Sequence, residues 1–317
     1  MDILKVGEKM KKNQVQKKRK KNTGINIIMG IIFLAGFLIF SYPILSNLYA
    51  NFYHTRVIDT YQKEVNKKSR DEKMKLVTDM INYNKDMVTG GELVGADPFD
   101  NKEPKEKEKK HKVIDALENK LGEVLGYITI PEIDAKLPLY SGASDLQLQK
   151  GIGVLEGTSL PIGGKSTHSV LTGHRGLPSS KLFSDLPELK KGDTFFIDII
   201  GETHEYRINQ IKTVLPEDIT DLRVVPEKDY ITLLTCTPYM VNTHRLLVRG
   251  ERIPLEKKEK EKKMPNWCCY LNTVLLIIII LLILLFWRYV HKMNKEQKYR
   301  EEQRLKRKKK KIRKKEE

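Results

Sequence analysis

Two long, uncharged hydrophobic runs constrain this chain more than any other feature of its sequence. Residues 25–45 and residues 267–287 are each 21 residues long and contain no ionised side chain. About 20 apolar residues in a helix are enough to cross the hydrocarbon core of a bilayer. We therefore predict a transmembrane helix near each end of the chain. The second run also has a tryptophan at each end, as is typical of the membrane interface.

The first run has a second interpretation. A lysine-rich start followed by an apolar stretch is also typical of a cleaved signal peptide. Residues 48–50 make a poor cleavage site, and the run is long for the core of a signal peptide. We favour a retained anchor, and cleavage stays open as the alternative.

The positive charge of the chain lies at its two ends. Of the formal net charge of +17, residues 1–22 supply +7 and residues 288–317 supply +10. The neutral segment between them argues against a nucleic-acid partner. Basic segments beside membrane spans tend to stay cytoplasmic, so we expect a multi-pass protein of the cell membrane with both termini inside and residues 46–266 outside. The basic tails would also bind anionic membrane lipid.

The composition divides the chain into seven parts. In order they are a basic tail (1–24), a hydrophobic run (25–45), a helical extension with an exposed loop (46–121), a strand-rich domain (122–253), a charged linker (254–266), the second hydrophobic run (267–287) and a basic tail (288–317). The strand-rich domain has seven or so short strand-type runs separated by turn residues. Helical patches interrupt it only around residues 145–150 and 180–189. This pattern predicts a mainly β fold with a closed or nearly closed barrel.

Cys236 is the only cysteine outside the second hydrophobic run. A secreted domain stabilised by disulfides would carry an even set of cysteines, so a single thiol is either buried and inert or kept for its reactivity. A thiolate nucleophile needs a nearby base and a group that holds charge on the substrate oxygen. No cluster of residues has metal-ligand spacing, and we expect no metal and no organic cofactor.

Three histidines are candidate partners for Cys236. His174 follows a strand and has glycines on both sides that let the chain turn and expose the ring, so we favour it. His168 and His244 remain alternatives. We place the other histidines on strand or helix surfaces or in the tail: His54, His111, His204 and His291.

Arg245 is a candidate for binding the substrate oxyanion. A strand that ends at Cys236 and one that begins near Thr243 predict a hairpin, which brings the residues beside its loop together. A guanidinium there stays charged and can donate to an oxyanion. Arg249 lies on the same face by strand alternation, so spacing alone barely separates the two arginines.

Three motifs in this order resemble the sortases, the cysteine transpeptidases of Gram-positive cell surfaces. Residues 232–236 (TLLTC) resemble the TLxTC signature, TGH ends at His174, and RLLV begins at Arg245. The resemblance covers roughly residues 122–253. The two predicted spans, the TCTPY sequence and a DPF tripeptide at 97–99 are similar to class C, the pilin-polymerising branch.

The resemblance implies a closed sortase-type β-barrel and a mechanism. Cys236 would attack the Thr–Gly carbonyl of an LPxTG-like sorting signal and form a thioacyl enzyme. His174 would act as general acid and base, and Arg245 would stabilise the oxyanion and the substrate. A lysine amine of another pilin subunit would then resolve the thioester. The motif residues are expected in the substrate groove: Thr232, Leu233 and Thr235.

The same resemblance implies a lid made by the DPF tripeptide. Asp97 would pair with Arg245, Phe99 would cover Cys236, and Pro98 would lie between them.

Met240 departs from the glycine expected after TCTPY, which bears on the hairpin turn and on the choice of acceptor. Two alternative functions stay open: a sortase that attaches surface proteins to peptidoglycan, and a non-enzymatic membrane adaptor with a buried, inert thiol.

Overall fold

A computed structural model of the chain describes residues 2–90, Phe99, residues 112–255 and separate residues between 273 and 307. The chain divides into two compact units, Met1–Lys257 and Lys258–Glu317. Most of the second hydrophobic run lies outside the described residues, as do Asp97 and Pro98 of the predicted lid. Within the described part of the chain, no helix meets the length and hydropathy that a bilayer crossing requires.

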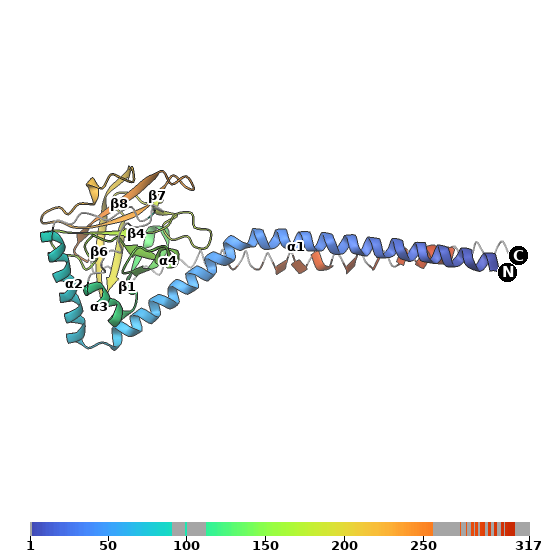
Figure 1. Cartoon of the computed structure of the whole chain (residues 1–317), viewed down its shortest axis with the longest axis horizontal. Coiled ribbons are helices and arrows are strands. Elements are labelled where there is room, and N and C mark those ends of the chain that lie inside the picture. The colour runs from blue at the N-terminus through green and yellow to red at the C-terminus, as the bar shows by residue number, and fades with distance from the viewer. Residues whose placement is uncertain are drawn as a thin grey trace. The chain divides into compact units, whose positions relative to one another are not determined.

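The first unit begins with three helices, α1 (Asp2–Lys67), α2 (Arg70–Gly90) and α3 (Lys112–Leu121). Helix α1 runs without interruption through the predicted boundaries after residues 24 and 45, because this stretch consists mostly of residues that tolerate helix. The one proline inside it, Pro43, does not end the helix. Figure 1 shows α2, α3 and the end of α1 beside the barrel.

The three helices pack an apolar face onto the barrel and share its main core. That face includes Ile58, Leu76, Met80 and Leu117, each at most 2% exposed. Tyr61 fixes α1 with two buried hydrogen bonds. Its hydroxyl donates to the carbonyl of Leu125 (2.6 Å) and accepts from the backbone N–H of Ile200 (2.8 Å). One side of each of these charged helices thus covers the barrel.

Eight strands form a closed barrel in the order β1-β2-β3-β4-β7-β8-β6-β5, and the predicted barrel is confirmed. The strands are β1 (Val124–Ile130), β2 (Ala135–Tyr140), β3 (Ile152–Val154), β4 (Thr167–Thr172), β5 (Thr194–Ile199), β6 (Glu202–Val214), β7 (Asp229–Thr237) and β8 (His244–Ile253). Two pairs, β2/β3 and β4/β7, are parallel and the other pairs are antiparallel.

Short helical segments connect the strands. Helix α4 (Asp145–Lys150) lies where a helical patch was predicted, and three single turns are of 3₁₀ type: η1 (Pro131–Ile133), η2 (Leu186–Glu188) and η3 (Thr220–Leu222). The helix predicted over residues 180–189 is wrong, because only η2 forms there. Leu182 adopts a φ of 39°, which is incompatible with a continuous right-handed helix.

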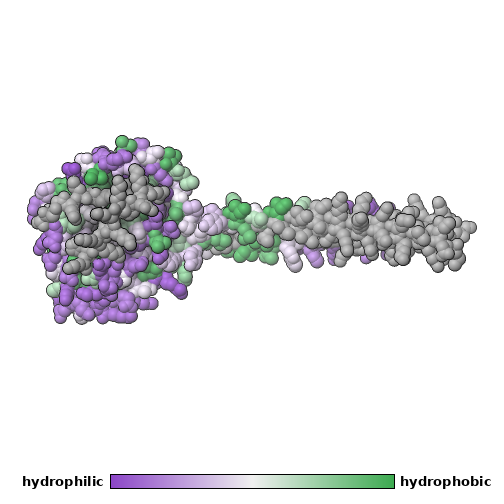
Figure 2. Space-filling model, viewed as in Figure 1, coloured by the Kyte–Doolittle hydropathy of each residue, from purple (hydrophilic) through white to green (hydrophobic). Residues whose placement is uncertain are grey.

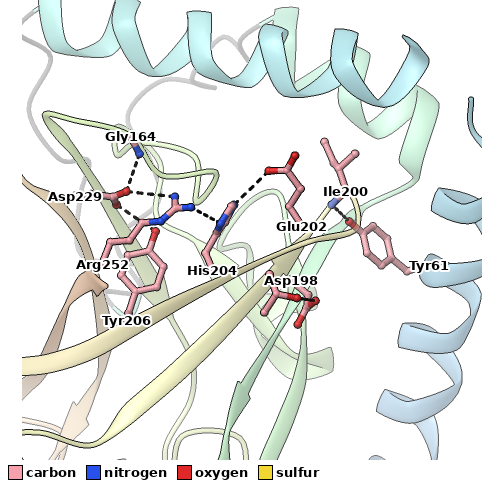
Figure 3. A network of polar contacts seen from close by, with 10 residues as sticks. Tyr61, Gly164, Asp198, Ile200, Glu202, His204, Tyr206, Asp229 and Arg252 are labelled. Atoms are coloured by element: carbon pink, nitrogen blue, oxygen red, sulfur yellow. Dashed lines mark hydrogen bonds and ion pairs between the residues drawn. The ribbon is translucent and has the colours of Figure 1, made fainter. Parts of the chain in front are cut away.

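Two histidines that we placed on the surface are buried, and these predictions are wrong. His54 on α1 is 3% exposed and His204 on β6 is 5% exposed. His204 belongs to a polar network around the start of β7 (Figure 3). There Arg252 Nη2 lies 2.6 Å from His204 Nδ1, and Asp229 accepts hydrogen bonds from Tyr206 and Arg252. A buried histidine is tolerated here because neighbouring strands supply its polar partner.

Candidate active site

Strand β7 carries Cys236 between β4 on one side and β8 on the other. The antiparallel ladder of β7 and β8 places Arg245 directly opposite Cys236. The parallel ladder of β4 and β7 pairs Thr172 with Leu234, and extending it by two residues brings His174 beside Cys236. Because neighbouring strands lie about 4.8 Å apart, the thiol is flanked by an imidazole and a guanidinium.

The end of β4 is fixed to β7 by two buried hydrogen bonds at Gly173, the residue before His174. The Gly173 N–H donates to the carbonyl of Leu234 (3.1 Å), and the Thr235 hydroxyl donates to the carbonyl of Gly173 (2.7 Å). A side chain at Gly173 would meet the Phe183 ring and Ile152 at less than 3.0 Å, so only glycine fits. The motif around His174 thus determines the position of its backbone.

Strand alternation puts the three side chains on the outer face of the barrel wall. Leu233 belongs to the main core, whereas Leu234 belongs to a second apolar cluster, so Cys236 lies on the same face as the second cluster. By the same alternation, His174 lies on the face of Val170 on β4, and Arg245 lies on the face of Leu247 on β8. Both Val170 and Leu247 belong to the second cluster. We call this second cluster the outer cluster: Leu155, Val170, Val214, Leu222, Leu234 and Leu247.

Phe99 is the one described residue of the predicted lid, and it lies in this site. Its ring packs against the outer cluster. The ring centroid lies 5.4 Å from that of His174, and Arg245 Cζ lies 5.4 Å from the Phe99 centroid. Phe99 therefore contacts both groups that flank Cys236, and the cation–π geometry with Arg245 is favourable. Cys236 and Arg245 are only 5% and 7% exposed.

The electrostatics of the site favour a neutral His174. Burial lowers the pKa of His174, and the nearby carboxylate of Asp145 at the start of α4 partly opposes this by raising it. Arg245 keeps its guanidinium aligned by donating from Nη1 to the carbonyls of Asn242 (2.9 Å) and His244 (3.0 Å). Part of the donor set of Arg245 is thus used to hold the β7–β8 loop.

The alternative histidines are placed elsewhere. His168 is 1% exposed on β4, with its ring nitrogens 2.9 Å from the carbonyl oxygen of Arg223 and 2.7 Å from Thr232 Oγ1. Burial lowers the pKa of His168 to about 4. His244 pairs with Thr237, one position beyond Cys236, and contacts the neighbouring Thr243 hydroxyl at 2.9 Å. His168 is therefore a structural core residue.

The prediction that the three motif residues line a groove is wrong for their side chains. Thr232, Leu233 and Thr235 are at most 1% exposed. Leu233 packs in the main core, while the two threonine hydroxyls bond to His168 and to the Gly173 carbonyl. They position β4 and β7 from within the wall, because the two threonine hydroxyls on β7 bond to His168 on β4 and to Gly173 just after it.

The structure also adds residues that the sequence reasoning missed. Arg175, directly after His174, donates from Nη1 to the Thr237 hydroxyl (3.0 Å) and lies over the Tyr239 ring at 5.7 Å. The arginine and glycine that follow TGH in the sequence were the only available signal. Met240 adopts a φ of 64°, which explains why glycine suits this turn position. Arg249, the rival of Arg245, pairs with Thr232 and bonds to Asn209 instead.

Among the residues that the structure describes, no group of histidine, cysteine and acidic side chains could hold a metal ion. The arrangement of thiol, imidazole and guanidinium is suited to acyl transfer through a covalent thioester. The imidazole can exchange a proton with the thiol and the leaving group, and the guanidinium can stabilise negative charge on the carbonyl oxygen.

Comparisons with known proteins agree with this chemistry. Residues 128–253 match the sortase domain family. The chain is 31% identical over 131 residues to sortase A of Streptococcus agalactiae and 32% identical over 146 residues to sortase A of Staphylococcus aureus. It spans about half the length of the first of these relatives (52%) and 69% of the second, and the matches cover 40% and 45% of this chain.

Solved structures extend the similarity beyond the barrel. Sortase C1 of pilus island 1 of group B Streptococcus superposes with a TM-score of 0.58 at 39% identity, covering 68% of this chain and 98% of that one. A pilus-related sortase C of group B Streptococcus is 45% identical, with a TM-score of 0.56 and coverages of 62% and 96%. Sortase C of Streptococcus pneumoniae is 39% identical, with a TM-score of 0.56 and coverages of 64% and 100%.

Proposed function

Because this chain belongs to the sortase family, in the class C branch, we propose that it is a cysteine transpeptidase that joins pilin subunits. One observation carries the proposal: the ladders of β4, β7 and β8 place Cys236 between His174 and Arg245 on one face. An adaptor with an inert thiol would have no reason to hold an imidazole and a guanidinium on either side of it.

The reaction would proceed in two acyl transfers. His174 takes the proton of the Cys236 thiol, the thiolate attacks the threonine carbonyl of the Thr–Gly bond in an LPxTG-like signal, and the carbon–nitrogen bond breaks to leave a thioester. His174 gives a proton to the departing glycine amine, and Arg245 stabilises the oxyanion. A lysine amine of another pilin subunit then attacks the thioester, His174 takes a proton from the amine, and the Cys236 thiolate is released as an isopeptide bond forms.

The pilin assignment is supported by the solved structures rather than by the barrel itself. The names of those structures tie them to pili or to pilin substrates, and they cover up to 68% of this chain, including residues outside the barrel. The position of Phe99 over the site supports a lid in this chain, with Asp97 and Pro98 completing it. Opening of that lid would admit the sorting signal.

We further propose that the two uncharged runs anchor the enzyme in the cell membrane, with both basic tails cytoplasmic and the barrel outside. The length of each run and the basic residues beside it support this orientation. The substrates and the polybasic tails would then meet opposite faces of the same bilayer. LPxTG-type surface proteins and anionic membrane lipid are the partners that this arrangement implies.

Intact mass spectrometry of the full chain in detergent micelles tests the proposal. Incubated with an LPxTG-type peptide, the wild type should gain the mass of the acyl group, and hydroxylamine should remove it. Cys236→Ala should abolish the adduct and Arg245→Lys should slow its formation at least tenfold, as expected when one oxyanion donor is lost. Arg249→Lys is the matched control, because Arg249 lies on the same strand face outside the site and should react as wild type.

A second step separates the two acyl acceptors. Offering the preformed adduct either a lysine side-chain amine or an N-terminal glycine amine distinguishes subunit joining from attachment to wall peptides. Faster release by the lysine amine supports the pilin assignment. A folded wild type that forms no adduct with any LPxTG-type peptide would contradict the proposal and favour the adaptor.

A further inference from the structure

The loop after Cys236 exposes three consecutive apolar residues. Tyr239, Met240 and Val241 are 54%, 70% and 63% exposed. The loop between β7 and β8, residues 238–243, carries no acidic or basic side chain. Three consecutive large apolar side chains are rarely exposed on a surface that contacts only water. Contiguous patches of this kind mark interaction sites.

Two further exposed apolar residues lie at the same end of the barrel. Leu215 (56% exposed) follows Val214, which pairs with Arg245. Leu146 (70% exposed) follows Asp145, whose charge reaches His174. Figure 2 shows hydrophobic residues at the edge of the globular part from which α1 departs, and on the adjoining part of α1. Exposed apolar residues thus surround the site, and others lie on α2 and before β7: Met74, Ile81, Val224 and Val225.

This end of the barrel is fixed to α1 next to the first hydrophobic run. The Ser46 hydroxyl donates to the carbonyl of Pro178 (3.0 Å), and the Lys181 N–H donates to Asn47 Oδ1 (3.4 Å). Ser46 directly follows the run at residues 25–45. Pro178 and Lys181 belong to the loop that begins after His174.

The same loop also contacts the exposed apolar residues. Arg175 lies over the Tyr239 ring, and a side chain at Gly176 would meet that ring at 3.0 Å. Gly176 and Pro178 are two residues apart, so Tyr239 lies within about 15 Å of Ser46 at the reach of an extended chain. Tyr239 therefore lies near the end of the hydrophobic run.

We infer that the active-site end of the barrel rests on the lipid bilayer, with Tyr239, Met240 and Val241 inserted into the membrane interface. The inference rests on the proposed membrane anchoring. Tyr42 and Tyr49 of α1, 54% and 71% exposed, flank the end of the run as aromatic residues do at an interface. The uncharged loop suits burial between lipid headgroups, and a lipid surface is the one partner that the end of the run already places beside the loop.

The consequence concerns the substrate. A sorting signal would reach Cys236 along the lipid surface, so a substrate whose signal lies next to the membrane is presented in place. A freely dissolved signal would have to enter between the barrel and the headgroups. The enzyme would thereby favour substrates that are still membrane-bound over soluble proteins carrying the same peptide.

Depth-dependent fluorescence quenching tests the inference. The full chain with all three cysteines changed to alanine is reconstituted in lipid nanodiscs, with Met240→Cys carrying an environment-sensitive dye. Lys165→Cys is the matched control: Lys165 is exposed and pairs with Glu227, beside the start of β7, and β7 spans about 26 Å from there to the site. Lipids with a quencher near the headgroup should quench the dye at position 240 and leave the dye at position 165 unchanged.

A second arm measures the contribution of the apolar side chains. In the wild-type background, Met240→Ser with Val241→Ser should reduce acylation by a membrane-anchored LPxTG substrate about tenfold, as the loss of about 1.4 kcal/mol of insertion predicts, and leave the reaction with the soluble peptide within about twofold.

The outcomes separate this inference from the proposed function. Equal, weak quenching at both positions in a chain that floats with the lipid would overturn the inference while leaving the chemistry intact. The loop would then be a docking surface for a protein substrate. A chain that does not float with lipid would overturn the anchoring and the inference together, and the soluble-peptide reaction would still report on Cys236.

Discussion

Replacing Thr235 by valine tests whether a buried hydroxyl holds His174 in place. Thr235 is fully buried, and its hydroxyl donates to the Gly173 carbonyl at 2.7 Å. Valine keeps the shape but leaves that buried carbonyl without its donor, which costs about 2 kcal/mol of folding free energy. The midpoint of thermal unfolding should fall by about 4–8 °C for a unit of this size.

The same substitution should also slow the chemistry. Gly173 precedes His174, and its N–H bond to Leu234 remains, so the end of β4 should loosen without detaching. A misplacement of about 1 Å can reduce a rate about 100-fold, and we expect acyl adduct formation to slow at least tenfold. Thermal unfolding of the full chain in micelles and timed mass spectrometry measure the two effects.

Thr172→Val is the matched control, because Thr172 lies at the end of the neighbouring strand β4, two residues before His174. The Thr172 hydroxyl is fully buried and has no hydrogen-bond partner among the described residues. Removing it should leave stability unchanged or raise it by about 1 kcal/mol. Equal destabilisation by the two substitutions, or an unchanged acylation rate in Thr235→Val, would refute the reasoning that the specific bond to Gly173 matters.

Three further predictions follow from burial and charge. Burial lowers the pKa of His54, His168 and His204 to about 4, whereas these histidines take up a proton near pH 6.5 in the unfolded chain. The free energy of unfolding should therefore fall as the pH drops from about 6.5 to 4, by about 3 kcal/mol for His168 alone. Urea unfolding at stepped pH measures this, and a flat profile would contradict it. Asp145→Asn removes a charge that raises the pKa of His174, so the pH–rate limb of His174 should move to lower pH, and an upward shift would disprove the assignment. Phe99→Ala should raise the alkylation rate of Cys236 about tenfold, because the packing of the ring, which contributes about 1.4 kcal/mol to keeping the thiol covered, is lost. Phe52→Ala, at an exposed position of α1, should leave the alkylation rate unchanged.

The barrel and the order of the site residues were accessible from the sequence because they depend on local patterns. Strand-type alternation and turn residues locate most strands, and the hairpin after Cys236 is a local feature that brings Arg245 opposite it. Only the three-residue strand β3 gives too short a pattern to detect. The glycines around His174 favour it from the sequence, but separating it from His168 and His244 required a resemblance to known proteins, because a parallel pairing between distant strands leaves no local signal.

Burial of polar side chains was the part that the sequence did not reveal. His204 sits in a charged stretch and reads as a surface residue until Arg252 of β8 provides its partner. The resemblance placed Thr232 and Thr235 in the groove, yet their side-chain partners are His168 on β4 and Gly173 just after it. In each case the deciding contact joins segments that are more than 40 residues apart, which strand and helix periodicity cannot report.

The parallel pairing of β4 with β7 has a consequence for how the protein acquires its reactivity. Thr235 and Gly173 meet across 62 positions of sequence, so this contact forms only after a long loop has closed. Contacts of this kind make a fold slow to complete. A nascent or partly folded chain would hold the thiol and the imidazole apart. The enzyme would therefore become active only once its barrel is complete. An incompletely folded chain would not form an acyl adduct with a substrate.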